Sequence, residues 1–177
     1  KKLLTKEELA ENKNNSKKID YGWLFNTRYI ALRKAYARFK EGGEDKSPIY
    51  KTYLKKNAHW LPDYALFMAL KEKFHGQSWY TWEESVKFRQ PDAMAQATAL
   101  LQEQIRFYCF VQYIFDKQWR ALRAYARQQD VRIIGDVPIY VPYDSADVWS
   151  NPHWFQLDEA MNPTAVAGCP PDAFSED

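Results

Sequence analysis

A short β-branched run near the C-terminal end of the chain limits its fold more than any other feature. The run covers Val131 to Ile134, follows a long helical pattern after a brief connector, and is bounded by Gly135 and Pro138. A run of this kind between breakers is typical of a buried strand, and Pro138 cannot continue a central strand because it has no amide hydrogen. Helix, short connector and strand in this order predict a parallel α/β sheet.

Asp136 lies at the carboxyl end of this predicted strand, and a loop rich in Asp, Ser, Tyr and Trp follows it. In β/α barrels the active-site side chains lie at the carboxyl ends of the strands. Asp136 is therefore a candidate active-site carboxylate. The alternative is a turn residue that caps the loop, and its position alone does not decide between the two.

Most of the remaining chain is predicted to be helical. A short helix is expected from Thr5 to Asn12, with Thr5 and Glu8 as a capping box. A second helix is expected from Asp20 as its cap to Gly42-Gly43 as its end, and a third begins at Ser47-Pro48.

The longest periodic segment runs from Ala97 to Ala126, where apolar residues recur every three or four positions. This pattern predicts one helix of about thirty residues, or two helices in close succession. An interruption of the helical pattern is expected at Pro62-Asp63. The shorter elements expected are a helix at 64–74, a short helix at 83–88 and a brief strand at 155–157.

Aromatic residues are frequent, at 16% of the chain. Such residues can anchor a helical core. They also offer flat apolar faces, with a polar group on Tyr and Trp, that match the face and rim of a sugar ring. Composition alone does not choose between these two roles.

Charge and cysteine content exclude several classes of function. The net charge is only +2 and the N-terminal lysines alternate with glutamates, so no nucleic-acid footprint is expected. Cys109 and Cys169 lack the spacing of a metal site and the three histidines are scattered, so we predict no metal, no disulfide and no cofactor. No apolar run reaches the roughly 18 residues of a membrane span, and no signal peptide opens the chain. We therefore expect a cytoplasmic protein with reduced thiols.

Three segments carry a specific resemblance: residues 135–141 (GDVPIYV), residues 144–152 (DSADVWSNP) and residues 167–175 (AGCPPDAFS). They resemble the amylomaltases, the 4-alpha-glucanotransferases of glycoside hydrolase family 77. The close resemblance covers about residues 104 to 177, and the earlier residues agree more loosely in their helical, aromatic character.

The resemblance implies a fold of the α/β class. It implies part of a (β/α)8 TIM barrel with a largely helical insertion subdomain, so that the chain itself is mostly α. We expect residues 1–103 to form the helical insertion subdomain, residues 104–141 a barrel helix and strand, and residues 142–177 a truncated active-site loop region. The abrupt beginning and end of the sequence indicate a fragment of a longer protein.

The activity that the resemblance implies is cleavage of an α-1,4-glucan and transfer of one piece to the 4-hydroxyl of an acceptor glucan. The mechanism would be retaining, with a nucleophilic carboxylate and an acid/base carboxyl group about 5 Å apart. In this family both lie on later strands, beyond this chain. We therefore predict that the fragment alone is inactive, and we expect α-1,4-glucans as its partners.

The resemblance also assigns secondary roles to residues of this chain. Asp136 resembles an aspartate that supports the catalytic centre by hydrogen bonding around the nucleophile. Asp172 and Phe174 lie in a loop that borders the acceptor side of the glucan groove. Sugar binding or packing of the loop is expected for a further set: Tyr140, Ser145, Asp147 and Trp149. Cys169 is interpreted as a packing residue.

Two alternatives stay open at this point. One is a plain α-glucan hydrolase of the same barrel type, which only the ratio of transfer to hydrolysis would separate from a transferase. The other is a non-catalytic helical interaction or glucan-binding module. The sequence does not determine the oligomeric state.

Overall fold

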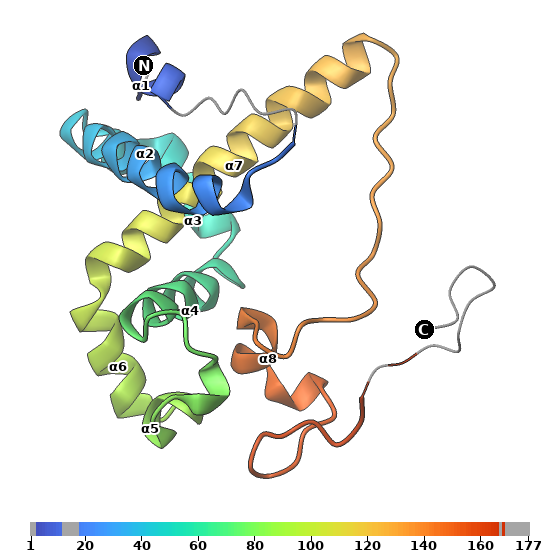
Figure 1. The fold of residues 1–177 in the computed structure, drawn as a ribbon. Coiled ribbons are helices and arrows are strands. Elements are labelled where there is room, and N and C mark those ends of the chain that lie inside the picture. Colours follow the sequence, from blue (N-terminus) through green and yellow to red (C-terminus); the bar gives the residue numbers. More distant parts are fainter. Residues whose placement is uncertain (1–2, 12–17, 167, 169–177) are drawn as a thin grey trace. The chain divides into compact units, whose positions relative to one another are not determined.

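The computed structural model describes residues 3–11, 18–166 and 168. The chain divides into two compact units, each built from two stretches of sequence. The first contains residues up to Pro62 together with Glu103–Arg132, and the second contains Asp63–Gln102 together with the residues from Ile133 onward. Figure 1 traces the helices of both units along the chain.

The first unit is helical and has an aromatic core. It contains α1 (Lys6–Glu11), α2 (Tyr21–Glu41), α3 (Pro48–Lys56) and nearly all of α7 (Gln102–Gln128). Phe39, Phe107 and Phe110 are almost fully buried, and the rings of Phe39 and Phe110 lie 4.9 Å apart between centroids. Large aromatic side chains at helical spacing thus pack α2 against α7.

Local signals define the helix ends of this unit, as the sequence predicts. Glu8 and Thr5 form both bonds of the capping box, at 2.9 Å and 3.2 Å. The Asp20 carboxylate accepts a hydrogen bond from the Trp23 amide at 2.9 Å, and the Ser47 hydroxyl accepts one from the Tyr50 amide. After α2 the chain turns at Gly43, whose φ of +70° suits glycine. These predicted caps are confirmed.

The second unit contains most of α4 (Leu61–Lys73), with α5 (Glu84–Lys87), α6 (Pro91–Leu100) and α8 (Ala146–Ser150). Two single 3₁₀ turns lie at Trp79–Thr81 and Pro152–Trp154. The centre of this unit is again aromatic. Phe67 lies 5.6 Å from Trp82 and 5.8 Å from Trp149 between ring centroids, and both tryptophans are buried.

Two helical predictions were resolved or corrected by the structure. The long periodic segment forms two helices, because α6 ends at Leu100 and α7 begins at Gln102. The interruption at Pro62 was wrong, since Pro62 lies in the first turn of α4. Proline is tolerated there because the first amides of a helix have no intrahelical partner.

The predicted buried strand after α7 is not formed. Residues 129–145 contain neither helix nor strand, and Ile134 is 93% exposed. A parallel strand takes its hydrogen bonds from neighbouring strands, and the described residues supply none. The brief strand at 155–157 is likewise reduced to one isolated antiparallel bridge between Leu157 and Pro163.

Among the described residues, no helix is both long enough and apolar enough to cross a membrane.

An ion pair links α1 to α2, and its contribution should respond to pH. Arg38 donates hydrogen bonds of 2.6 Å and 2.8 Å to the two carboxylate oxygens of Glu8, and these bonds lower the pKa of Glu8 to about 2. Because the pKa is lowered in the folded protein, the pair contributes fully above the ordinary value of 4.5. Its contribution is lost as the pH falls from there toward 2.

An NMR pH titration of the Glu8 side chain should therefore give a midpoint near 2. The variant Arg38→Met should move this midpoint back toward 4.5. A midpoint already near 4.5 in the unaltered protein would show that the pair does not form.

Candidate functional site

A groove of about 580 Å³ lies in the second unit, in the loop region that follows the predicted strand. Its lining is mainly apolar and aromatic. Two of its aromatic side chains are open to solvent, with Tyr140 58% exposed and Trp154 70% exposed. The lining includes Ile139, Tyr140, Tyr143, Val148, Trp154 and Leu157.

A tight turn joins Leu157 and Pro163, two residues that line the groove. The Asp158 carboxylate accepts hydrogen bonds from the Asn162 amide at 2.7 Å and from the Asn162 side chain at 3.2 Å. The backbone bond is the main reason that the pKa of Asp158 is lowered. Met161 completes the turn with a φ of +66°. The turn that connects these lining residues is therefore held by its own short-range hydrogen bonds.

Tyr143 joins this turn to the helical part of the second unit. Its hydroxyl donates to the Met161 carbonyl oxygen, and its own carbonyl accepts from the Trp79 indole N–H at 2.7 Å. Its ring stacks on Tyr80 with the centroids 4.6 Å apart and the planes 10° from parallel. Burial raises the pKa of Tyr143, so the hydroxyl remains a neutral donor near pH 7.

Hydrogen bonds of Asp144 connect the same loop to the end of α4. Its carboxylate accepts from Lys71 Nζ at 2.7 Å, from Ser78 Oγ at 3.1 Å and from the Trp79 amide at 3.3 Å. Lys71 also donates to the carbonyl oxygen of Gly76 at 2.9 Å. Charge-assisted hydrogen bonds of this kind are stronger than neutral ones. Asp144 is therefore a residue that positions the loop.

Two of the predicted site residues lie on the segment before this loop. Tyr140 lines the groove, and its hydroxyl donates to the Gly168 carbonyl oxygen at 3.4 Å. Asp136 is exposed and does not line the groove, and one of its carboxylate oxygens accepts from the Val137 amide at 2.8 Å. This local contact is the one expected of a turn residue. A catalytic supporting role for Asp136 stays a prediction.

Three further predicted site residues lie in α8 or at its N-cap, and the sequence did not predict this helix. Ser145 caps it by accepting from the Val148 amide at 3.3 Å, and Asp147 is exposed in its first turn. Trp149 is 1% exposed, and its indole N–H donates to the Val86 carbonyl oxygen at 3.2 Å. Packing and capping account for the observed contacts of Ser145 and Trp149, and sugar binding by these three residues stays a prediction.

The last two predicted site residues, Asp172 and Phe174, lie outside the described residues, as does Cys169. Cys109 is a free thiol in the first unit, and burial raises its pKa to about 11. An acidic, reactive thiol needs the opposite environment. Within the described ranges, no cluster of three or more His, Cys, Asp or Glu side chains could hold a metal ion.

Sequence reasoning missed Trp154 and Asp144. The position of Trp154 after Pro152, in a proline-rich loop, was a recognisable signal in the sequence, and the structure adds that its ring is exposed. Asp144 had no such signal, because nothing local distinguishes it from Asp147.

The lining of the groove offers aromatic faces and hydroxyl groups, which suit a ring with an apolar face and a polar rim. The lining residues include no carboxylate that could act as an acid or base.

Comparisons with known proteins agree with the resemblance seen in the sequence. The family model described as 4-alpha-glucanotransferase matches residues 1–177. A 4-alpha-glucanotransferase of Clostridium butyricum is 41% identical over 179 residues, which are 99% of this chain and 36% of that protein. One of Thermus thermophilus is 44% identical over 160 residues, which are 90% of this chain and 32% of that protein.

A solved structure is also similar. The amylomaltase from Streptococcus agalactiae in complex with acarbose matches with a TM-score of 0.88 and 35% identity. The match covers 99% of this chain and 36% of that one. The chain thus spans about a third of the length of the relatives that it matches.

Proposed function

The chain belongs to glycoside hydrolase family 77, and we propose that the enzyme containing it is a 4-alpha-glucanotransferase. The observation that carries the proposal is the family match over all 177 residues. The enzyme would cut an α-1,4-glucan and transfer one segment to the 4-hydroxyl of an acceptor glucan. Retention of configuration requires a nucleophile and a separate acid/base group. We assign both to parts of the enzyme beyond this chain, and we therefore expect the chain alone to be inactive.

We further propose that residues 104–141 provide a helix and a strand of a (β/α)8 barrel, with residues 1–103 as a helical insertion and 142–177 as an active-site loop region. Two exposed apolar surfaces support this arrangement. Ile134 and Ile139 are 93% and 81% exposed on the segment expected to be a strand. The second half of α7 exposes Phe115 and Leu122, at 60% and 52%. Neighbouring barrel strands would bury both surfaces.

The groove of the second unit is the proposed glucan-binding surface of this chain. Trp154 and Tyr140 present aromatic faces on which a sugar ring can stack, and the Tyr140 hydroxyl can exchange its weak bond for one to a sugar hydroxyl. The similar amylomaltase was solved with acarbose bound. Asp172 and Phe174 are proposed to border the acceptor side of the same glucan-binding surface. Ser145, Asp147 and Trp149 are proposed to bind sugar next to this surface or to pack behind it.

In the proposed mechanism this chain contributes in three ways. The loop must hold the glucan in one orientation, and the contacts of Asp144 and Tyr143 keep that loop in place. Its aromatic lining must exclude water, because the second half of the reaction favours a sugar hydroxyl over water. Asp136 is proposed to hold the nucleophile in place by hydrogen bonding. Positioning of this kind is a large part of enzymatic rate enhancement.

Incubation of the complete enzyme with maltotriose should yield glucose together with chains longer than the substrate, as separated by chromatography. Transfer between two substrate molecules produces both products at once. Shorter products alone would indicate the hydrolase alternative. A folded enzyme that forms no product would indicate a non-catalytic glucan-binding module.

The same assay tests the groove with the variant Trp154→Ala. Loss of one stacking face should raise the acceptor concentration needed for half-maximal transfer by roughly threefold to tenfold, since an aromatic contact contributes about 0.5–1.5 kcal/mol. An unchanged acceptor dependence would remove Trp154 from the glucan path without affecting the assignment of the reaction.

A further inference from the structure

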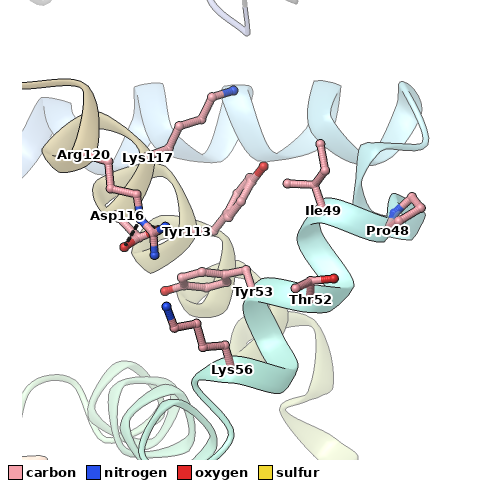
Figure 2. Close-up of a pocket in the computed structure, with 9 residues that line it drawn as sticks. All are labelled: Pro48, Ile49, Thr52, Tyr53, Lys56, Tyr113, Asp116, Lys117 and Arg120. Carbon is pink, nitrogen blue, oxygen red and sulfur yellow. Dashed lines mark hydrogen bonds and ion pairs between the residues drawn. The ribbon is translucent and has the colours of Figure 1, made fainter. Parts of the chain in front are cut away.

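A second groove, of about 490 Å³, lies in the first unit between α3 and α7 and has no role in the glucan path proposed above. Figure 2 shows its nine lining side chains, which come from these two helices alone. The lining is apolar at one end, with Pro48 and Ile49, and charged at the other, with Asp116 and Arg120. A groove with one apolar end and one charged end favours a ligand that has an apolar part and a charged part.

The aromatic side chains of this groove are held rigidly. Tyr113 packs edge-on against Tyr53, at 5.2 Å between centroids and 61°, and against Tyr50, at 5.1 Å and 72°. Tyr53 is only 7% exposed, and burial raises its pKa to about 12, so its hydroxyl stays protonated. The surface that meets a ligand is therefore formed before binding, which lowers the entropy cost of association.

The polar groups of the groove are mostly donors without acceptors. Arg120 contacts Asp116 through Nε alone, at 3.0 Å and 2.8 Å to the two carboxylate oxygens, which leaves its two terminal amino groups available. Within the described part of the chain, the ammonium groups of Lys56 and Lys117 and the hydroxyl of Tyr53 have no hydrogen-bond partner. The lining contains three cations and one carboxylate, so its net charge favours an anionic ligand rich in hydrogen-bond acceptors.

The arrangement of these donors indicates where the anion would lie. In Figure 2 the Lys56 ammonium, the Tyr53 hydroxyl and the Arg120 guanidinium point to the same end of the groove. The Lys117 ammonium lies at the opposite end. Asp116 is partly neutralised by Arg120. A phosphate group, with three acceptor oxygens, matches the end that holds Lys56 and Arg120.

The groove also lies on a different face of α7 from the surface assigned to the barrel. At 100° per residue, Tyr113, Asp116 and Arg120 share one side of the helix, whereas Phe115, Trp119 and Leu122 occupy the other. Together with Tyr125, these last three are the exposed large apolar residues of that half of α7. The groove thus remains accessible when the apolar side is covered.

We propose that this groove binds a sugar phosphate, with the phosphate between Lys56 and Arg120 and the sugar ring against Ile49 and Tyr113. The ring has an apolar face for Ile49 and Tyr113 and hydroxyl groups for Thr52, which also lines the groove. The ligand class follows from the donors and the apolar end together. This site goes beyond the transfer reaction and does not depend on it.

Isothermal titration of the complete enzyme with glucose 6-phosphate tests the proposal. Glucose 6-phosphate should bind, inorganic phosphate should bind at least several-fold more weakly, and glucose should not bind at this site. Lys56→Met should weaken glucose 6-phosphate binding roughly tenfold, the loss expected for one hydrogen bond to a charged group. Higher salt should weaken binding as well.

Lys55→Met is the matched control. Lys55 and Lys56 are adjacent and exposed in the last turn of α3, but only Lys56 lines the groove. The control should bind glucose 6-phosphate as the unaltered enzyme does, and both variants should keep their melting temperature and their transfer activity on maltotriose. No binding, equal binding of inorganic phosphate, or equal losses in both lysine variants would overturn the proposal.

Discussion

Replacement of Trp149 with alanine should lower the free energy of unfolding by about 3–5 kcal/mol. Trp149 is 1% exposed and lies 5.8 Å from both Phe67 and Trp82 between ring centroids. Its indole N–H donates to the Val86 carbonyl oxygen, and the Arg89 guanidinium lies 4.2 Å from its ring. The variant would leave a cavity in the centre of the second unit, and the Val86 carbonyl oxygen would keep only its bond from the Arg89 amide.

Urea unfolding measured by circular dichroism would show this loss as a lower midpoint. Trp154→Ala is the matched control, because Trp154 belongs to the same loop region but is 70% exposed. It should change the free energy of unfolding by about 0.5 kcal/mol or less. Equal effects of the two variants would mean that Trp149 is not a core residue.

Asp136→Asn should reduce the turnover of the complete enzyme by on the order of 100-fold or more, as removal of one preorganised hydrogen-bonding group in an active site can do. The amide keeps the shape of the carboxylate but loses its charge and one acceptor. Stability should hardly change, because the contact that the structure shows for Asp136 is with the neighbouring Val137 amide. Turnover on maltotriose and thermal unfolding of the same sample separate the two effects.

Asp130→Asn is the control for this change. Asp130 carries the same side chain at the other end of the segment, and its φ of +55° is one that asparagine adopts readily. It should leave turnover unaltered. Near-normal turnover of a well-folded Asp136→Asn enzyme would mean that Asp136 is only the turn residue that its local contact suggests.

Local structure could be predicted well from the sequence. The caps at Thr5, Asp20 and Ser47 all formed as expected. Each involves groups three residues apart, so nearby residues contain all the information needed. The segments at residues 135–141, 144–152 and 167–175 likewise indicated the family, and the family match confirms it.

The strand prediction failed for a different reason. The run Val131–Ile134 has the composition of a buried strand, but a strand exists only through its neighbours. The described residues offer no partner strand, so the run stays open and Ile134 is exposed. The composition of this segment indicates that it needs neighbouring strands, and the described residues do not provide them.

The sequence by itself determined the capped helix starts at Thr5, Asp20 and Ser47, the family and the candidate loop, because each depends on residues close together along the chain. Only the tertiary structure decided which side chains of that loop pack and which remain open. Trp149 is buried and Trp154 exposed, although the two tryptophans lie close together in the sequence. Asp144 became a positioning residue through Lys71, which is 73 positions away. The burial and the pairing of a side chain depend on such distant segments, and a local sequence pattern does not contain this information.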